Sequence, residues 1–281
     1  MGMGNIFNPD NAFFTFMGKA FDIIVLNLVW LLLYVPFGGF LYLYGSTQIF
    51  IFLVLAAASL VVFIPSMIAM YYSVVKSVRR SRSYAVKEFI RSFKANFRQG
   101  ALASVIFFIL AWLLYIDFQY SWALVKEQDS KGVIFLGVFL IITFFISGLF
   151  IYLCPVISRF SMDLKSAFKF SFGISVKHFW CTILSFLMWV AVILLTYLTM
   201  GFVLLFGVAL GTLLGSFMME KVLKKYVLQT IENQKKAAEE AGNGEDAIGG
   251  ADAPTKIAKP EYTESFEDGG ENTKKDEWYL E

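Results

Sequence analysis

Long uncharged apolar stretches alternate with short clusters of charge along most of this chain. No charged residue occurs in residues 23–75 or 179–219. Each of these stretches is too long for a single membrane-crossing helix of about 20 residues and long enough for two. Turn-forming residues divide the first at 45–48 and the second at 199–201. The pattern therefore predicts a pair of membrane-spanning helices in each stretch.

Two further apolar segments lie between these stretches. A short loop with charges of both signs separates them at residues 126–131. Pro36 and Pro65 should bend the first two helices, because proline removes one backbone hydrogen bond. The sequence thus predicts an all-α fold, a polytopic bundle of six transmembrane helices at about residues 21–44, 49–75, 100–124, 132–158, 179–198 and 202–219.

The predicted loops differ strongly in their content of lysine and arginine. Residues 76–98 hold eight, the loop between the fourth and fifth helices holds four, and the segment after the sixth helix holds three. The alternate loops hold none, two and none. Because cationic residues favour the cytoplasmic side of a bilayer, we expect a multi-pass plasma-membrane protein with both termini in the cytoplasm.

The composition supports a membrane protein and separates an apolar main part of the chain from an acidic C-terminal segment. It is 58% hydrophobic and only 16% charged, whereas soluble domains average about 25% charged residues. Residues 226–281 are different, with 6 Lys and Arg against 14 Asp and Glu. We expect an N-terminal interfacial segment (1–20), a six-helix transmembrane domain (21–225), and a cytoplasmic helix extension with a disordered acidic tail (226–281).

Catalytic chemistry has little support in this sequence. A membrane enzyme needs titratable or nucleophilic groups that converge in a cavity, and the predicted spans contain no Lys, Arg, Glu or His in their interiors. Metal and nucleotide motifs are lacking as well, so we expect no catalytic residue, metal or cofactor. Asn27, Ser59, Ser147 and Ser185 could line a polar transport cavity, or bond neighbouring helices in ordinary packing.

An amphipathic helix is predicted at residues 84–98, at the end of the first basic loop. Its aromatic and cationic side chains follow two adjacent stripes at helical spacing. Such a helix fits the anionic headgroups of a lipid bilayer or the acidic surface of a partner, although its cations also suffice as a topology signal. Its attachment to the membrane plane argues against nucleic acid. The candidate interaction residues are Lys87, Phe89, Arg91, Phe93, Lys94, Phe97 and Arg98.

Small residues also recur along the predicted sixth span. Gly207, Gly211 and Gly215 follow one another at intervals of four and share one helix face. Such a face lets another backbone approach closely. The neighbour is either another helix of the same bundle, which we favour, or a second copy of the chain in a homo-oligomer.

Two stretches of this sequence are similar to one known family. The first is NPDNAFFTFMGK at 8–19, and the second is FIRSFKANFRQ at 89–99, which follows Pro65 and the Tyr71–Tyr72 pair. They resemble the YesL family of bacterial integral membrane proteins, a domain of unknown function. Members of that family are often encoded beside carbohydrate ABC transporters and polysaccharide-degrading enzymes. The resemblance therefore implies a part in sugar uptake, and it carries over no catalytic residue.

These observations lead to one expected function and two alternatives. We expect a non-enzymatic protein of the bacterial plasma membrane that assists or regulates carbohydrate uptake, with an ABC transporter subunit as its partner. The first alternative is a small-molecule transporter or channel in its own right, and the second is a membrane enzyme. A continuous polar cavity lined by Asn27 and the span serines would favour transport.

Overall fold

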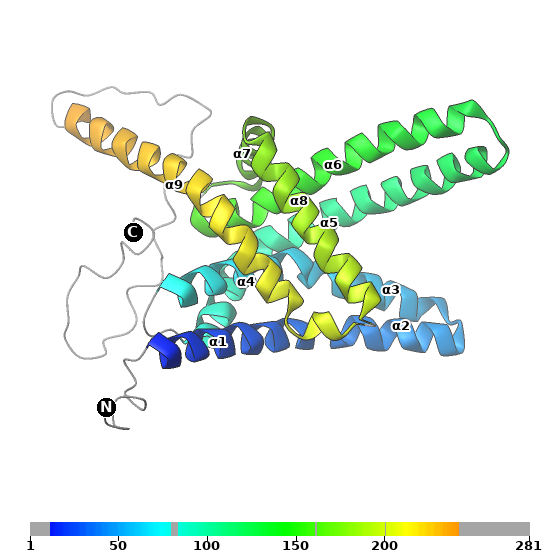
Figure 1. Cartoon of the computed structure of the whole chain (residues 1–281), viewed down its shortest axis with the longest axis horizontal. Helices are drawn as coiled ribbons and strands as arrows, with labels where there is room; N and C mark the ends of the chain where they lie inside the picture. Colours follow the sequence, from blue (N-terminus) through cyan, green and yellow to red (C-terminus); the bar gives the residue numbers. More distant parts are fainter. Residues whose placement is uncertain (1–11, 80–83, 161, 200, 242–281) are drawn as a thin grey trace.

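The computed structural model describes residues 12–79, 84–160, 162–199 and 201–241. Within them the chain is helical with short turns, in agreement with the all-α prediction (Figure 1). The α-helices are α1 (Ala12–Leu32), α2 (Val35–Thr47), α3 (Phe50–Ser59), α4 (Phe63–Arg79), α5 (Ala85–Lys126), α6 (Ser130–Arg159), α7 (Leu164–Lys177), α8 (Phe179–Leu198) and α9 (Gly207–Ala241). Two 3-10 helices, η2 (Leu60–Val62) and η3 (Phe202–Leu205), lie between them.

Several of these segments are long and apolar enough to cross a membrane. Four meet that description by themselves: Phe50–Val78, Ala85–Lys126, Ser130–Arg159 and Phe179–Leu198. A fifth is added if Met17–Leu32 and Val35–Thr47, which are bent by 41°, count as one span. The fold is therefore that of a multi-pass helical membrane protein.

The predicted sixth span at 202–219 is divided in the structure. Gly201 adopts a φ of 91°, and η3 follows it, so the chain changes direction before α9 begins. The uncharged part of α9 then ends at Glu220 and Lys221, too soon for this helix alone to cross the roughly 30 Å hydrocarbon core. Six spans and the cytoplasmic location of the termini stay predictions, and residues 1–11 and the acidic stretch 242–281 lie outside the described residues.

The breaks inside the first two spans occur where the sequence predicts them. α1 ends three residues before Val35, and Pro36 occupies the first turn of α2, where its missing N–H costs nothing. The 3-10 helix η2 interrupts the second span just before Pro65. Gln48 closes α2 in the left-handed conformation with a φ of 56°, so the chain turns at the last residue of the predicted 45–48 turn, and residues 45–47 still belong to the helix.

Helix α4 lies at the centre of the molecule and packs against α1, α5, α6 and α9. Its closest neighbour is α5, because Gly100 has no side chain: a Cβ at Gly100 would stand only 2.9 Å from Cα of Pro65. Away from this centre, α2 with α3 and the outer parts of α5 with α6 form two helical hairpins that diverge (Figure 1). The outward-facing apolar side chains of these hairpins are exposed, as lipid contact requires.

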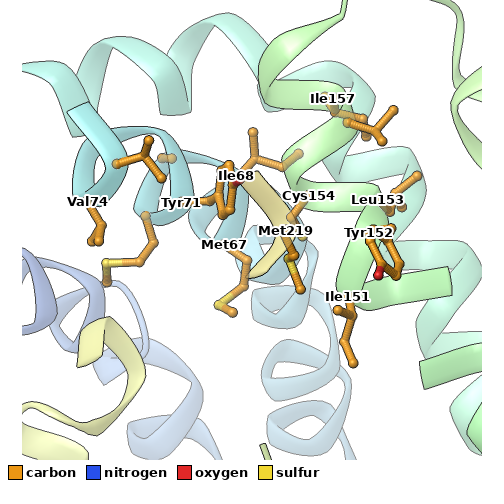
Figure 2. Packing of buried hydrophobic residues seen from close by; sticks show 14 of the residues in the cluster. Met67, Ile68, Tyr71, Val74, Ile151, Tyr152, Leu153, Cys154, Ile157 and Met219 are labelled. Atoms are coloured by element: carbon orange, nitrogen blue, oxygen red, sulfur yellow. The ribbon is translucent and has the colours of Figure 1, made fainter. Parts of the chain in front are cut away.

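The hydrophobic core lies where α4, α6 and α9 meet. Figure 2 shows Tyr71 of α4, Cys154 of α6 and Met219 of α9 gathered in this region. Ile68 and Tyr152, from α4 and α6, are fully buried in the same cluster. The middle of α4 is therefore packed against side chains from two other regions of the sequence.

Three sequence predictions need correction at the level of elements. The basic segment after the fourth span is not a loop, because α7 covers 164–177. Residues 84–98 do not form a separate helix either, since they belong to the first turns of α5, a continuous helix of 42 residues. Finally, α1 runs unbroken through residue 20, so the described part of the expected interfacial segment continues directly into the first span.

Candidate functional site

Ionic contacts gather at the C-terminal end of α4. Nζ of Lys76 lies 2.7 Å from Oε1 of Glu88 on α5 and 5.3 Å from the ring centre of Tyr72. Only 7% of Lys76 is exposed. This ion pair joins α4 to α5.

A second charged group joins α4 to helices that are distant in the sequence. Nη2 of Arg159, on α6, and the hydroxyl of Tyr71, on α4, both donate to Oε1 of Glu220 on α9, each at 2.5 Å. Arg159 and Glu220 are only 7% and 9% exposed. Charges are tolerated inside a protein when each is paired with an opposite charge, and Arg159 and Glu220 meet this condition. With Tyr71 they form one compact polar contact among α4, α6 and α9.

Helix α1 is attached to the same end of α4. Nζ of Lys19 donates to the carbonyl of Val78 at 2.6 Å, and the hydroxyl of Ser77 donates to Oδ2 of Asp22 at 2.8 Å. A cation at the C-terminal end of a helix also interacts favourably with its dipole. Together with the two ion pairs, these bonds fasten α1, α5, α6 and α9 around one end of α4, and we call this set the ionic cluster.

Sequence analysis missed the ionic cluster. It counted Lys76 and Arg159 as cations of exposed loops, and the structure buries both. The available signal was their counter-ions, because Glu88 is the lone acid of a basic segment and Glu220 precedes a run of lysines. A charge at the end of a span looks the same in a sequence whether it contacts water or a partner on a remote helix.

The predicted interaction helix at 84–98 is divided between core and surface. Phe89 is 2% exposed, and Phe93 packs against the hydrophobic core, so these two rings stabilise the protein instead of entering lipid. Phe97 is 41% exposed. The cations Lys87, Lys94 and Arg98 lie on the exposed face of α5, and Arg91 is half-buried.

A groove of about 820 Å³ runs between α1 and the first turns of α5. Lys87, Arg91 and Lys94 line it from α5, together with the apolar side chain of Ile90. The wall on α1 contains Phe21, Asp22 and Val25. We call it the basic groove. Its lining combines three cations and the one carboxylate of Asp22 with apolar side chains, a net positive charge that suits an acidic and partly apolar binding partner.

Of the polar residues considered for a transport cavity, three make hydrogen bonds that stabilise the fold, whereas the buried hydroxyl of Ser185 has no hydrogen-bond partner among the described residues. Asn27 is fully buried, donates from Nδ2 to the carbonyl of Leu204 at 2.6 Å, and accepts the N–H of Ala209 at 2.9 Å. It therefore satisfies the backbone where η3 turns into α9. Ser59 and Ser147 donate to carbonyls of their own helices. Ser185 is fully buried.

A second cavity, of about 580 Å³, lies beside the α5–α6 hairpin. Its described lining comes from α1, η2, α4, α5, α6, α8 and α9 and contains no charged residue. Asn27 does not line it, and its two serines are Ser104 and Ser147. We call it the apolar cavity. The residues expected to form a polar cavity are thus not brought together.

The glycine face of α9 packs against α8. A Cβ at Gly211 would lie 3.4 Å from Cγ2 of Val192 and 3.6 Å from the ring of Trp189. At Gly215 it would lie 3.2 Å from Cε of Met188. The neighbour of this face is therefore a helix of the same chain. Gly207 is closest to Val203, in η3.

Two titratable groups outside the spans have shifted pKa values. Burial lowers the pKa of His178, with a further contribution from the nearby cations Lys177 and Lys225, so its imidazole is neutral at pH 7. Its Nε2 lies 3.4 Å from the hydroxyl of Tyr226. The pKa of Asp163 is lowered by its bond with Ser166, in keeping with its place as the N-cap of α7.

The structure thus defines a helical multi-pass membrane protein with an ionic cluster, a basic groove and an apolar cavity. Over residues 23–118 the chain matches the family model described as "Protein of unknown function, DUF624". The matched segment includes the Lys76–Glu88 pair and all the cations of the basic groove. No curated protein and no solved structure matched the chain. Membership of the YesL family stays a prediction.

Proposed function

We propose that this protein is a non-enzymatic component of the bacterial plasma membrane that assists or regulates carbohydrate uptake by an ABC transporter. The main support is the apolar cavity, whose described lining offers a sugar too few hydrogen-bond partners for this chain to transport it alone. The sugar context comes from the resemblance to the YesL family. The basic groove provides the contact surface.

Sugar transport by this chain alone is the weaker alternative. Sugars carry many hydroxyl groups, and burying one without a hydrogen-bond partner costs about 1–3 kcal/mol in proteins. Among the described residues, the lining of the apolar cavity contains two serines and no charged side chain, and both serine hydroxyls already donate to carbonyls. A sugar would therefore lose more hydration than this cavity can replace.

The basic groove is the surface through which we expect the partner to bind. We place it on the cytoplasmic side, with six spans and both termini in the cytoplasm, because loops on that side carry most Lys and Arg. The partner then has an acidic cytoplasmic surface with some apolar side chains. Anionic headgroups offer the groove similar charge, and attraction to a leaflet is worth about 1 kcal/mol per cation near the surface.

Deletion and complementation in a bacterial host test the proposal. We expect a deletion strain to take up particular sugars more slowly, and the full chain to restore uptake and to co-purify with a sugar ABC transporter in mild detergent. Purified protein in vesicles should not take up those sugars by itself. Sugar uptake by such vesicles would contradict the proposal and favour the transporter alternative.

Charge reversal tests the basic groove without disturbing the core. Lys87→Glu with Lys94→Glu changes two exposed residues of the groove, and we expect uptake and co-purification to fall to the level of the deletion strain. The matched control is Lys126→Glu with Lys131→Glu, because these lysines are also exposed and lie far from the groove, at the end of α5 and the start of α6. If both double variants behave alike at equal abundance, the groove is not the contact surface. Phe93→Ala is unsuitable as a surface probe, because that ring packs on the core.

A further inference from the structure

The basic groove lies beside the ionic cluster and opens to the surface. Asp22 belongs to both, because it lines the groove and its Oδ2 accepts the hydroxyl of Ser77. The two lysines of the groove are exposed, and so are its apolar side chains Phe21 and Ile90, at 66% and 45%. The charges and the apolar contacts of the groove are therefore accessible to a further segment of protein.

The lining of the groove determines the chemistry of what binds there. Three cations outnumber the one carboxylate, so an acidic ligand is favoured. The volume of about 820 Å³ is within the range of small-ligand sites, about 300–1,000 Å³, so the groove receives a few side chains and not a folded domain. A short peptide segment with several acids and some apolar side chains meets both conditions.

The chain itself contains such a segment. The longer stretches outside the described residues differ sharply in charge: 1–11 has one acid, 80–83 has two arginines and no acid, and 242–281 has eleven acids against four lysines. Within the last of these, EYTESFED at 261–268 has four acids, no cation and two aromatic residues. We call it the acidic segment. Its carboxylates and its aromatic rings complement the cations and the apolar side chains of the groove.

The acidic segment is near enough along the chain to reach the groove. Helix α9 passes the ionic cluster at Glu220 and ends at Ala241, about 32 Å further along its axis. The start of α1 and the C-terminal part of α9 lie on the same side of the molecule (Figure 1). Nineteen residues, 242–260, separate Ala241 from the segment, and a chain of that length spans up to about 60 Å. The length of the chain therefore allows the contact.

We infer that the acidic segment binds in the basic groove of its own chain, with its carboxylates at the cations and its aromatic rings at the apolar side chains. Because the two sites belong to one molecule, the effective concentration is in the millimolar range, and a weak contact suffices. A bound segment covers the surface that we propose for the transporter. The contact itself does not depend on the proposed function, whereas the resulting competition with the transporter does.

Site-specific photo-crosslinking in the full chain tests the inference. The photoreactive residue p-benzoylphenylalanine replaces Phe266, and the protein is irradiated in vesicles of phosphatidylcholine. Mass spectrometry of the digested monomer should find crosslinks to residues 21–25 of α1 and 84–94 of α5. The matched control places the same photoreactive residue at Trp278, another aromatic position among acids, and should give far fewer crosslinks to the groove.

Charge reversal identifies the groups that make the contact. Glu264→Lys with Glu267→Lys alters only the acidic segment and should lower the crosslink yield about 5-fold or more, since attraction becomes repulsion at two exposed pairs. Lys87→Glu with Lys94→Glu should lower the yield as well. Combining all four changes restores opposite charges and should recover the yield, which a misfolded variant could not do.

Each contrary result overturns the inference. Crosslinks from Phe266 that avoid the groove, or equal crosslinks from Trp278, would show that the acidic segment does not bind there. Crosslinked dimers in place of crosslinked monomers would mean that a second copy of the chain binds. Loss of the crosslinks when phosphatidylglycerol replaces part of the phosphatidylcholine would assign the groove to anionic headgroups. A yield that the combined changes do not recover would exclude the pairing of charges.

Co-purification with a sugar transporter separates this inference from the proposed function. If both hold, Glu264→Lys with Glu267→Lys should increase the amount of transporter retained, because the segment no longer covers the groove. An unchanged amount would contradict the competition. Crosslinks in a protein that retains no transporter would contradict the proposed function and still support the contact between the acidic segment and the groove.

Discussion

At the scale of single residues, the most consequential contact is the buried group of Arg159, Glu220 and Tyr71. Two charges are removed from water there, and each is tolerated because the other is near. Glu220→Gln keeps the shape and the hydrogen-bonding capacity of the side chain but removes the negative charge beside Arg159. We expect this change to destabilise the protein by about 3–5 kcal/mol, seen as a lower Tm in detergent.

Two further variants make that prediction specific. Glu127→Gln makes the same chemical change at an exposed turn and should leave the Tm within experimental error. Arg159→Met with Glu220→Leu removes both charges and should recover much of the lost stability, because apolar pairs of similar volume often replace buried ion pairs at little cost. A Tm of Glu220→Gln equal to the wild type would mean that water reaches this carboxylate.

The buried side chain of Asn27 leads to a second prediction about a single residue. Its side chain satisfies the carbonyl of Leu204 and the N–H of Ala209, two backbone groups that the start of α9 leaves unpaired. Asn27→Leu has nearly the same shape and should cost about 1–3 kcal/mol. The control is Asn96→Leu, because Asn96 bonds only within its own helix, to Ser92. Equal effects of the two changes on the Tm would contradict the role of Asn27 in satisfying these backbone groups.

At the scale of elements, the contact between α8 and α9 depends on the glycine face. Gly211→Leu inserts a side chain where Val192 and Trp189 already stand, and overpacking of this kind costs about 1–3 kcal/mol. Gly137→Leu on α6 is the matched control, since nothing lies within 4 Å of a Cβ there. If the glycine face contacts α8, Gly211→Leu should unfold at a lower Tm than Gly137→Leu. Equal Tm values would contradict the contact.

The elements also show how far the sequence could be interpreted. Turns at 45–48 and near Gly201, and bends at Pro36 and Pro65, depend on local chemistry, so a single sequence reveals them. Helix α7 was missed because its cations resemble those of a loop. Its signals were the N-cap Asp163 and buried residues at helical spacing, Ala167, Ser171 and Ile174. The ionic cluster could not be predicted, because Arg159 and Glu220 are 61 positions apart, and only the packing of α6 on α9 brings them together.

At the scale of the whole molecule, orientation in the bilayer is the prediction to test first. Reporter fusions after Gln48 and Gln128 should lie outside the cell, and fusions after Arg82 and Lys165 should lie inside, because the loops rich in Lys and Arg stay in the cytoplasm. Gln48 and Gln128 suit this purpose, since each occupies a turn with a positive φ, of 56° and 60°. An inverted result at two or more sites would exclude the six-span arrangement.

The unbroken length of α5 has a mechanical consequence for the whole molecule. From Gly100, where it is held against Pro65, this helix extends roughly 22 Å towards the basic groove and roughly 39 Å towards the tip of its hairpin, at about 1.5 Å per residue. It can therefore act as a lever with its pivot at Gly100. A partner that tilts the short arm moves the long arm in the opposite direction and nearly twice as far. Phe107 and Ala111 lie on that long arm and line the apolar cavity, so a tilt of α5 about Gly100 would change the width of this cavity.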